Sequence, residues 1–372
     1  MINFDFASLR LIGLTPAIAN QLHALAADYA DAGDDATLAT LATLATLQMV
    51  RITEVHRDSL VVHNGYNTLQ ARALPRLLHE LAADDDSLAV GDWGLLSNIS
   101  GDTANAYHFI ARMPPLTHLA RRNNEGRRQA LASNIDTALL MMGLDSDFNL
   151  RRLERYLALV HAAEVAPVVV LTKADVHADA PARLAEVEQR LSASVPVFAV
   201  NGQSSMAADM LAPWMAAGQT LILLGSSGAG KSTLTNTLTS STQDTGAVRA
   251  TDGRGQHTTT ARSLHLCPGG ACIIDTPGLR TLQLNLDEEA LSASFADIDA
   301  LAAECQFRDC SHQSEPGCAV RAVVDEDRLK NYQKLLRETR RNQQTPLDRI
   351  AARSKWKVLM RSVKERDKVK RG

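Results

Sequence analysis

The sequence predicts an α/β plus β-barrel fold in three parts: a small barrel, an α/β domain and a helical C-terminal domain. Five short runs of alternating polar and apolar residues, separated by Gly, Asp and Asn turn signals, occupy residues 48–113. Strongly apolar runs then alternate with helical patterns between residues 134 and 275, which is typical of a mostly parallel sheet covered on both faces. After residue 287 the pattern is mostly helical, and three of the five cysteines lie there.

The barrel region begins after an Ala/Leu-rich segment, residues 1–47, which we expect to be a helical extension. Within residues 48–115, the expected strands are 48–55, 59–65, 67–73, 93–99 and 107–113. Five short strands in so short a span are typical of a small barrel such as an OB-fold. Such barrels bind nucleic acid in some proteins and are plain scaffolds in others, and the sequence does not separate the two. Residues 114–128, with Pro114, Pro115 and a basic stretch, are expected to be a linker.

The α/β domain is expected at residues 116–286, and the helical domain with its basic tail at 287–372. Helices are expected at residues 150–163 and 180–192. The strands of the sheet are expected at residues 134–142, 166–171, 195–200, 219–224 and 271–275.

A phosphate-binding loop follows the strand at residues 219–224, with the form G-x-x-x-x-G-K-S, and precedes a helical pattern. Glycines let backbone N–H groups curl inward around phosphate oxygens, and the N-terminus of the following helix adds positive potential. Lys231 is expected to reach the β- and γ-phosphates, and the Ser232 hydroxyl to ligate Mg²⁺. The nucleotide-binding residues expected here are Gly225, Ser226, Ser227, Gly228, Ala229, Gly230, Lys231, Ser232 and Thr233.

Two segments that could respond to the γ-phosphate follow this loop. Asp275 ends a buried strand and begins Asp-Thr-Pro-Gly, where the carboxylate is expected to hold Mg²⁺ and Gly278 to contact the γ-phosphate. Residues 253–260, Gly-Arg-Gly-Gln-His-Thr-Thr-Thr, offer threonines that can ligate Mg²⁺ from a mobile loop. Thr259 is our preferred ligand, and the neighbouring threonines remain open.

The base is expected to be guanine because Thr172-Lys173-Ala174-Asp175 follows a buried strand. Asp175 can accept two hydrogen bonds from guanine, which adenine cannot donate in the same pattern, while the stem of Lys173 packs on the purine. Thr172 stands where asparagine is usual and offers fewer bonds to brace the loop. Residues 200–202, Val-Asn-Gly, are a weaker candidate for the next base-contacting loop.

The order of these motifs is permuted, since the base-selecting segment precedes the phosphate loop. A parallel sheet tolerates this rearrangement because its strands keep their places and only the connections change. Leu279 occupies the position where many GTPases have a water-orienting glutamine, so another group must orient the attacking water. His257 is the best local candidate. The catalytic residues expected are His257, Lys231 and Thr259.

A metal site is predicted where three thiols and one imidazole fall within fourteen residues, with the spacing Cys-x₄-Cys-x-His-x₅-Cys. This set closes a tetrahedral shell and matches structural zinc. The expected ligands are Cys305, Cys310, His312 and Cys318. Cys267 and Cys272 flank Pro-Gly-Gly in an expected hairpin and are interpreted as bystanders.

Charge is divided unevenly along the chain. From Arg328 onward there are sixteen Lys/Arg and four Asp/Glu, whereas the whole chain has a net charge of -3. Basic helices at residues 328–341 and 353–371 therefore favour a polyanionic partner such as structured RNA. We expect a cytoplasmic protein, because no apolar run reaches the about 18 residues of a membrane helix and no secretion signal is present.

Together, the five-stranded barrel, the permuted order, GRGQHTTT, DTPG followed by an aliphatic residue, and the Cys/His cluster resemble the ribosome small subunit-dependent GTPases. The resemblance covers about residues 45–340. It implies an OB barrel, a circularly permuted GTPase domain and a zinc-binding helical domain. It also implies one structural Zn²⁺, a catalytic role for His257, and the small ribosomal subunit with its rRNA as partner. We further expect GTP or GDP to bind with Mg²⁺, and the protein to be a monomer.

The function implied is GTP hydrolysis during late maturation of the small subunit, stimulated by that subunit. The departures in the guanine loop and at residues 200–202 leave a second hypothesis, a divergent paralogue that binds RNA or ribosomes in a nucleotide-dependent way with little turnover. A third is an ATP-driven enzyme with the same phosphate loop.

Overall fold

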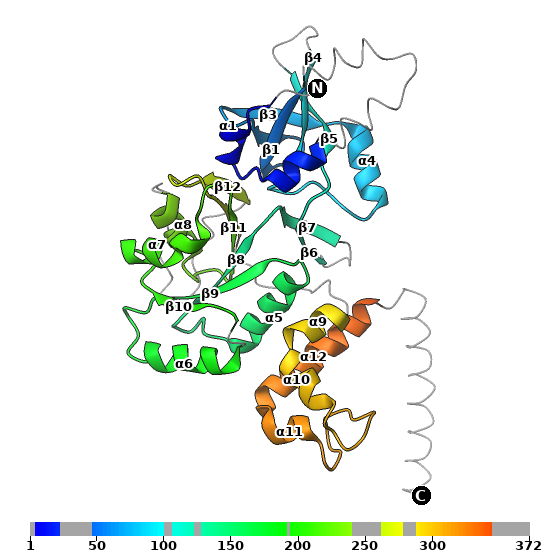
Figure 1. Cartoon of the computed structure of the whole chain (residues 1–372), viewed down its shortest axis with the longest axis vertical. Coiled ribbons are helices and arrows are strands. Elements are labelled where there is room, and N and C mark those ends of the chain that lie inside the picture. Colours follow the sequence, from blue (N-terminus) through cyan, green and yellow to red (C-terminus); the bar gives the residue numbers. More distant parts are fainter. Residues whose placement is uncertain are drawn as a thin grey trace, which may run out of the picture. The chain divides into compact units, whose positions relative to one another are not determined.

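The computed structural model describes residues 4–22, 47–99, 106–122, 128–191, 194–239, 262–277 and 288–343. The chain forms two compact units, Met1–Gln283 and Leu284–Gly372. The first unit contains the barrel and the α/β sheet, and the second is helical (Figure 1). Among the described residues, no helix is both long enough and apolar enough to span a bilayer.

The barrel is a closed ring of five strands in the order β1-β2-β3-β5-β4, with β4 pairing back onto β1. All neighbours are antiparallel except β3 and β5. Alternating apolar residues face inward, with Val50, Val62 and Phe109 fully buried. The predicted strands are confirmed as β1 Gln48–Val55, β2 Leu60–His63, β3 Thr68–Ala73, β4 Trp93–Ile99 and β5 Ala106–Arg112.

A helix that the sequence analysis missed, α4 Pro75–Ala83, lies between β3 and β4. Its first residue is proline, which suits the first turn of a helix, and Leu77 and Leu81 pack into the barrel core. The described part of the N-terminal extension holds α1 Phe6–Arg10 and a further helical stretch at residues 16–22. Its apolar side chains pack against Met49 and Trp93, so this segment covers the outer side of β1 and β4.

The α/β sheet has the order β10-β9-β8-β11-β13-β12 and is parallel except for its last strand. The central strand β11 Thr220–Gly225 lies between β8 Thr137–Gly143 and β13 Cys272–Asp275. Outward from β8 lie β9 Ala166–Thr172 and β10 Val197–Val200. This arrangement confirms the predicted parallel sheet and places the carboxyl ends of its strands along one edge.

Helices cover both faces of this sheet (Figure 1). On one face, α7 Ser205–Leu211, η1 Ala212–Trp214 and α8 Lys231–Thr239 share a core with alternate residues of the strands. Helices α5 Leu150–His161 and α6 Ala180–Arg190 pack against β8, β9 and β10. The near-continuous apolar strands found in the sequence are explained by this burial on two sides.

The prediction of a linker at residues 114–128 is wrong. The chain there enters a two-stranded antiparallel ribbon, β6 His118–Arg122 with β7 Arg128–Ser133. Ala132 also forms a bridge to Val90 of the barrel region. The sequence analysis missed β6 because its last two residues, Arg121 and Arg122, belong to a run of basic residues that resembles a connection.

The barrel and the sheet are joined by β12 Ser263–Leu266, which pairs with β13 on one side and with β1 at Glu54 on the other. The hairpin of β12 and β13 confirms the turn expected around residues 268–270. A buried side chain strengthens the junction: the guanidinium of Arg51, with no exposed surface, donates to four groups from distant segments. The acceptors are the carbonyls of Ile12 (2.7 Å), Gly91 (3.3 Å) and Asn134 (3.0 Å) and the Thr220 hydroxyl (2.9 Å).

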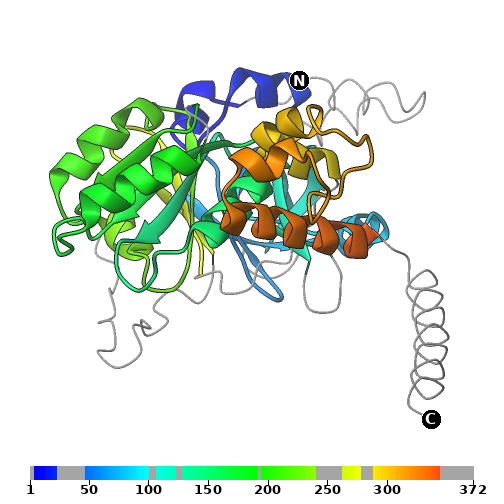
Figure 2. The ribbon, with the colours of Figure 1, turned by 90° about the horizontal axis from the view of Figure 1, so that it is seen from below.

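The second unit contains four helices among its described residues: α9 Glu288–Ser294, α10 Ala296–Ala302, α11 Ala319–Val323 and α12 Glu326–Gln343. Figure 2 shows α12 as the longest of them, with the shorter helices beside it. Phe295 contacts Tyr332 with ring centroids 5.2 Å apart, and few other large apolar side chains are buried here. The residues from 344 onward, which include the predicted second basic helix, lie outside the described part.

Candidate nucleotide site and metal-ligand cluster

The phosphate loop connects the end of β11 to the start of α8, as the sequence predicts. Gly228 and Gly230 both have φ 85°, a left-handed conformation that favours glycine. Gly225 lies so close to β8 that a Cβ there would come within 2.6 Å of the Met141 carbonyl oxygen. The loop is thus built by backbone geometry that side chains would block, and this geometry suits it to surround an anion.

Lys231 is the buried cation of this loop, with 7% of its surface exposed. Its ammonium donates to the carbonyls of Gly225 (3.1 Å) and Ser226 (2.7 Å), so it bends back over the loop. Burial lowers the pKa of Lys231 to about 8, and the nearby carboxylates of Asp275 and Asp147 oppose that shift. An incoming phosphate would stabilise the charged form that burial disfavours.

Asp275 ends β13 at the same edge of the sheet and is fully buried. The next residue, Thr276, donates its hydroxyl to the Leu223 carbonyl at 2.6 Å, which fixes the strand end beside β11. A buried carboxylate and the half-buried Ser232, the second residue of α8, are a donor set that suits Mg²⁺. Four residues of the prediction, His257, Thr259, Gly278 and Leu279, lie outside the described part of the chain.

The guanine loop lies next to the phosphate loop. The hydroxyl of Thr172 donates to the Ala229 carbonyl at 2.9 Å, and a Cβ added at Gly230 would lie 3.5 Å from the same side chain. Lys173 has φ 62°, an uncommon conformation for a side chain of its size, and Asp175 is exposed. Of the next loop, Gly202 accepts a hydrogen bond from Thr237 of α8 at 2.8 Å, so residues 200–202 also reach this edge.

Sequence reasoning missed two aspartates that the structure brings to the same edge. Asp145 pairs with Lys173 at 2.5 Å, and Asp147 accepts a hydrogen bond from the Ser226 hydroxyl at 2.5 Å. Both lie in the loop after β8, which is the strand between β9 and β11. The available signal was an Asp-x-Asp directly after a strongly apolar strand, at the edge where the other predicted site residues meet.

The Cys/His cluster is assembled in the second unit. The ligand atoms of Cys305, Cys310, His312 and Cys318 all lie within 4.8 Å of one another. The sulfurs of Cys305 and Cys318 are 3.9 Å apart, and the Nδ1 of His312 lies 3.7 and 3.5 Å from them. Tetrahedral bonds of about 2.3 Å place two sulfur ligands about 3.8 Å apart, so the cluster can hold a metal of this kind.

Backbone groups support the charge that a bound thiolate would carry. The amide of Arg321 donates to the sulfur of Cys318 at 3.5 Å. Hydrogen bonds from the backbone of Val320 and Ala319 lower the pKa of Cys305. Burial raises the pKa of Cys310 to about 11 and that of Cys267, outside the cluster, to about 12.

The chain is similar to known GTPases of one family. Residues 113–285 match the family model described as RsgA GTPase, and residues 220–351 match the model of a 50S ribosome-binding GTPase. The small ribosomal subunit biogenesis GTPase RsgA of Opitutus terrae is 42% identical over 338 residues, covering 86% of this chain and 91% of the relative. The protein of the same name from Xanthomonas axonopodis is 41% identical, with 82% and 85% covered.

The chain belongs to the RsgA GTPase family. Membership makes it a GTP hydrolase with a phosphate loop, in agreement with the motifs. Two solved structures share the fold. YjeQ from Thermotoga maritima has a TM-score of 0.56 at 20% identity, covering 79% of this chain and 98% of that one. The circularly permuted GTPase YloQ has a TM-score of 0.54 at 19% identity, with 81% and 98% covered.

Proposed function

We propose that this RsgA-family GTPase acts on the small ribosomal subunit during its late maturation and hydrolyses GTP there. The observation that supports one site for guanine nucleotides is the hydrogen bond of 2.9 Å from Thr172 to Ala229, which joins the proposed base-selecting loop directly to the phosphate loop. Selection of the base and grip on the phosphates thereby belong to one site. Relatives at 41–42% identity are named for small-subunit biogenesis, which supports the choice of subunit.

In this proposal Lys231 binds the β- and γ-phosphates, while Ser232, Asp275 and Thr259 hold the Mg²⁺ that comes with GTP. His257 orients the attacking water, since Leu279 has no group that could. Asp175 reads guanine and Lys173 packs on the purine, with Thr172 bracing the loop. Gly278 contacts the γ-phosphate, so that loss of this phosphate on hydrolysis changes the position of the residues that follow.

We further propose that the Cys/His cluster holds one structural Zn²⁺. Three thiolates and one imidazole leave no open position for water, which favours a structural over a catalytic ion. The domain limits proposed above, 1–47, 48–115, 116–286 and 287–372, remain our working division. We place the protein in the cytoplasm as a monomer.

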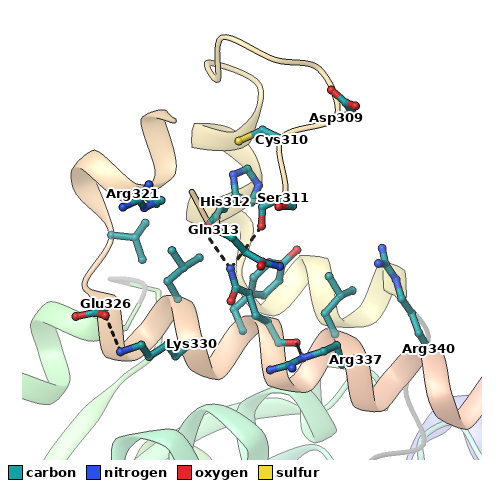
Figure 3. A pocket seen from close by; sticks show the side chains of 15 residues that line it. Asp309, Cys310, Ser311, His312, Gln313, Arg321, Glu326, Lys330, Arg337 and Arg340 are labelled. Atoms are coloured by element: carbon teal, nitrogen blue, oxygen red, sulfur yellow. Dashed lines mark hydrogen bonds and ion pairs between the residues drawn. The ribbon is translucent and has the colours of Figure 1, made fainter. Parts of the chain in front are cut away.

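For the contact with rRNA we propose a basic cavity in the second unit. It has a volume of about 900 Å³ and lies between residues 309–313 and helix α12 (Figure 3). Its exposed cations are Arg321, Lys330, Arg337 and Arg340. Acidic neighbours offset two of them: Lys330 pairs with Glu326 at 2.6 Å, and Arg340 with Glu288 at 2.9 Å.

The remaining cations, Arg321 and Arg337, are suited to phosphate oxygens because a guanidinium can donate two parallel hydrogen bonds to them. The floor of the cavity is fixed by Gln333, whose amide donates to the carbonyls of Ser311 and His312. The metal-ligand loop and the basic helix are thus held together. Phosphate binding at this place would therefore depend on an intact Cys/His cluster.

The activity is tested by measuring phosphate release from GTP while purified small or large subunits are added. We expect slow turnover alone, strong stimulation by small subunits and little by large ones. The Asp175→Asn variant should lose its preference for GTP over ATP, because an amide cannot accept both guanine hydrogen bonds. Equal stimulation by both subunits, or unchanged base selection in the variant, would refute the proposal.

The RNA contact is tested with the Arg321→Gln/Arg337→Gln variant. Its affinity for small subunits should fall. The slope of log affinity against log salt concentration should also become less steep, by about one unit for each phosphate that is no longer neutralised. Lys334→Gln is the matched control, because Lys334 is exposed on the same helix but does not line the cavity. Equal losses in both variants would show that the general charge of α12, and not the cavity, binds RNA.

A further inference from the structure

The loop after β8, residues 144–149, lies between the two halves of the nucleotide site. Strand β8 has β9 on one side and β11 on the other, so its carboxyl end separates the guanine loop from the phosphate loop. The backbone amide of Leu144 donates to the Thr172 carbonyl at 3.0 Å, which joins this loop to the guanine loop. We call residues 144–149 the acidic loop, after Asp145 and Asp147.

Asp145 holds the base-selecting side. Its carboxylate pairs with the ammonium of Lys173 at 2.5 Å, with about a quarter of each side chain exposed. Burial is the largest single influence and raises the pKa of Asp145, but the hydrogen bonds from Lys173 and the Asp147 backbone, together with the positive charge of Lys173, outweigh it and the net shift is downward. The backbone of Lys173 is left-handed, and the pair with Asp145 holds the long side chain of Lys173 against the acidic loop.

Asp147 holds the phosphate side. One carboxylate oxygen accepts from the Ser226 hydroxyl at 2.5 Å and from Arg152 at 2.6 Å, and the other accepts from the backbone amide of Gly143 at 3.1 Å. The Ser226 carbonyl in turn accepts from Lys231. Because Arg152 neutralises Asp147, the carboxylate positions the loop without repelling an incoming phosphate.

The two aspartates are linked within the loop. The backbone amide of Asp147 donates to the Asp145 carboxylate at 3.0 Å, while each side chain keeps its own partners on its own side of the site. Arg183 of α6 fixes the loop from outside, donating to the carbonyls of Leu144 at 2.6 Å and Asp145 at 3.2 Å. Its guanidinium also lies 5.0 Å from the centre of the Phe148 ring.

We propose that Asp145 and Asp147 are positioning residues of this GTPase, Asp145 for the purine and Asp147 for the β- and γ-phosphates. The inference rests on the proposed function, because it assumes that Lys173 packs on guanine and Lys231 binds phosphate. If the two aspartates have these separate roles, their effects on nucleotide affinity can be measured separately. Loss of Asp145 weakens every guanine nucleotide, whereas loss of Asp147 weakens only those with a β-phosphate.

The test measures GMP and GDP affinity by calorimetry, and GTP turnover with small subunits, for Asp145→Asn and Asp147→Asn. For Asp145→Asn we expect GMP and GDP affinity to fall by the same factor, about tenfold, with KM raised and kcat unchanged. For Asp147→Asn we expect GDP affinity to fall about tenfold while GMP affinity stays within about twofold. Asp145→Glu, which keeps the carboxylate, should recover part of the lost affinity.

Asp209→Asn serves as the control, since Asp209 is an exposed aspartate on α7. An equal loss of GMP and GDP affinity in both test variants, without recovery in Asp145→Glu, would overturn the inference and leave a purely structural loop. Unchanged affinities in both variants would overturn it as well. A wild-type protein that does not prefer GDP to ADP would instead refute the proposed function, so the two failures are distinct.

Discussion

The two units of this protein stabilise their sites in different ways. In the first, the nucleotide site is formed by the ends of strands whose side chains are buried on both faces, and its loops bond to one another without a ligand. In the second, fewer large apolar side chains are buried, and four residues that could hold a metal ion converge near α10 and α11. We therefore expect the first site to be held by hydrophobic packing and the second unit to depend on a bound ion for its order.

The largest expected effect separates the two units. Cys310→Ser, or removal of the metal with a chelator, should unfold much of the second unit, because structural zinc contributes about 10–16 kcal/mol in small zinc domains. Helical circular dichroism and zinc content measure the loss, and GDP affinity should stay within about twofold. Cys267→Ala, outside the cluster, is the matched control. A fully helical second unit without metal would contradict the comparison.

The second prediction concerns the stability of the first unit. Arg51→Met should lower its free energy of unfolding by about 3–5 kcal/mol, because three buried carbonyls and a hydroxyl lose their donor. Urea unfolding followed by Trp93 fluorescence measures the loss, since that ring lies 5.5 Å from the guanidinium. Arg57→Met replaces an exposed arginine on the same barrel and should change little. A loss below about 1 kcal/mol would show that the junction does not need Arg51.

The smallest expected effect is a pH dependence that only the first unit should show. Burial lowers the pKa of Lys231 from 10.5 to about 8, so between these values the folded, nucleotide-free protein binds fewer protons than the unfolded chain. Its free energy of unfolding should therefore rise with pH across this window. Bound phosphate restores the charge, so GDP binding takes up a proton above pH 8, and affinity falls by at most about tenfold per pH unit.

Calorimetry at pH 9 in two buffers of different ionisation enthalpy measures that proton uptake. Lys231→Arg is the control, because arginine stays charged throughout this range. Uptake of equal size in the variant would mean that another group titrates. In the full chain, the pH dependence of unfolding of the second unit should be the same with and without GDP.

The difference between the nucleotide site and the Cys/His cluster could largely be predicted from the sequence, because the residues that form each motif lie close together in the chain. The phosphate loop and the Cys/His spacing each fall within a short segment. Alternation of polar and apolar residues predicted the strands of the barrel, and near-continuous apolar runs predicted those of the sheet. The hairpin of β6 and β7 was not predicted, since its arginines resemble a linker. Arg51 and the acidic loop were also missed, because their partners lie 28 to 169 residues away, as for Lys173 with Asp145 and Thr220 with Arg51.

The order of the motifs along the chain determines the order in which the parts of the nucleotide site are synthesised. Strands β8, β9 and β10 are consecutive in the chain and adjacent in the sheet, so they can pair as soon as they leave the ribosome. Strand β11 comes next and must dock against the exposed edge of β8, followed by the hairpin of β12 and β13. The nascent chain thus completes the purine-reading half first and adds the triphosphate-binding half onto that template.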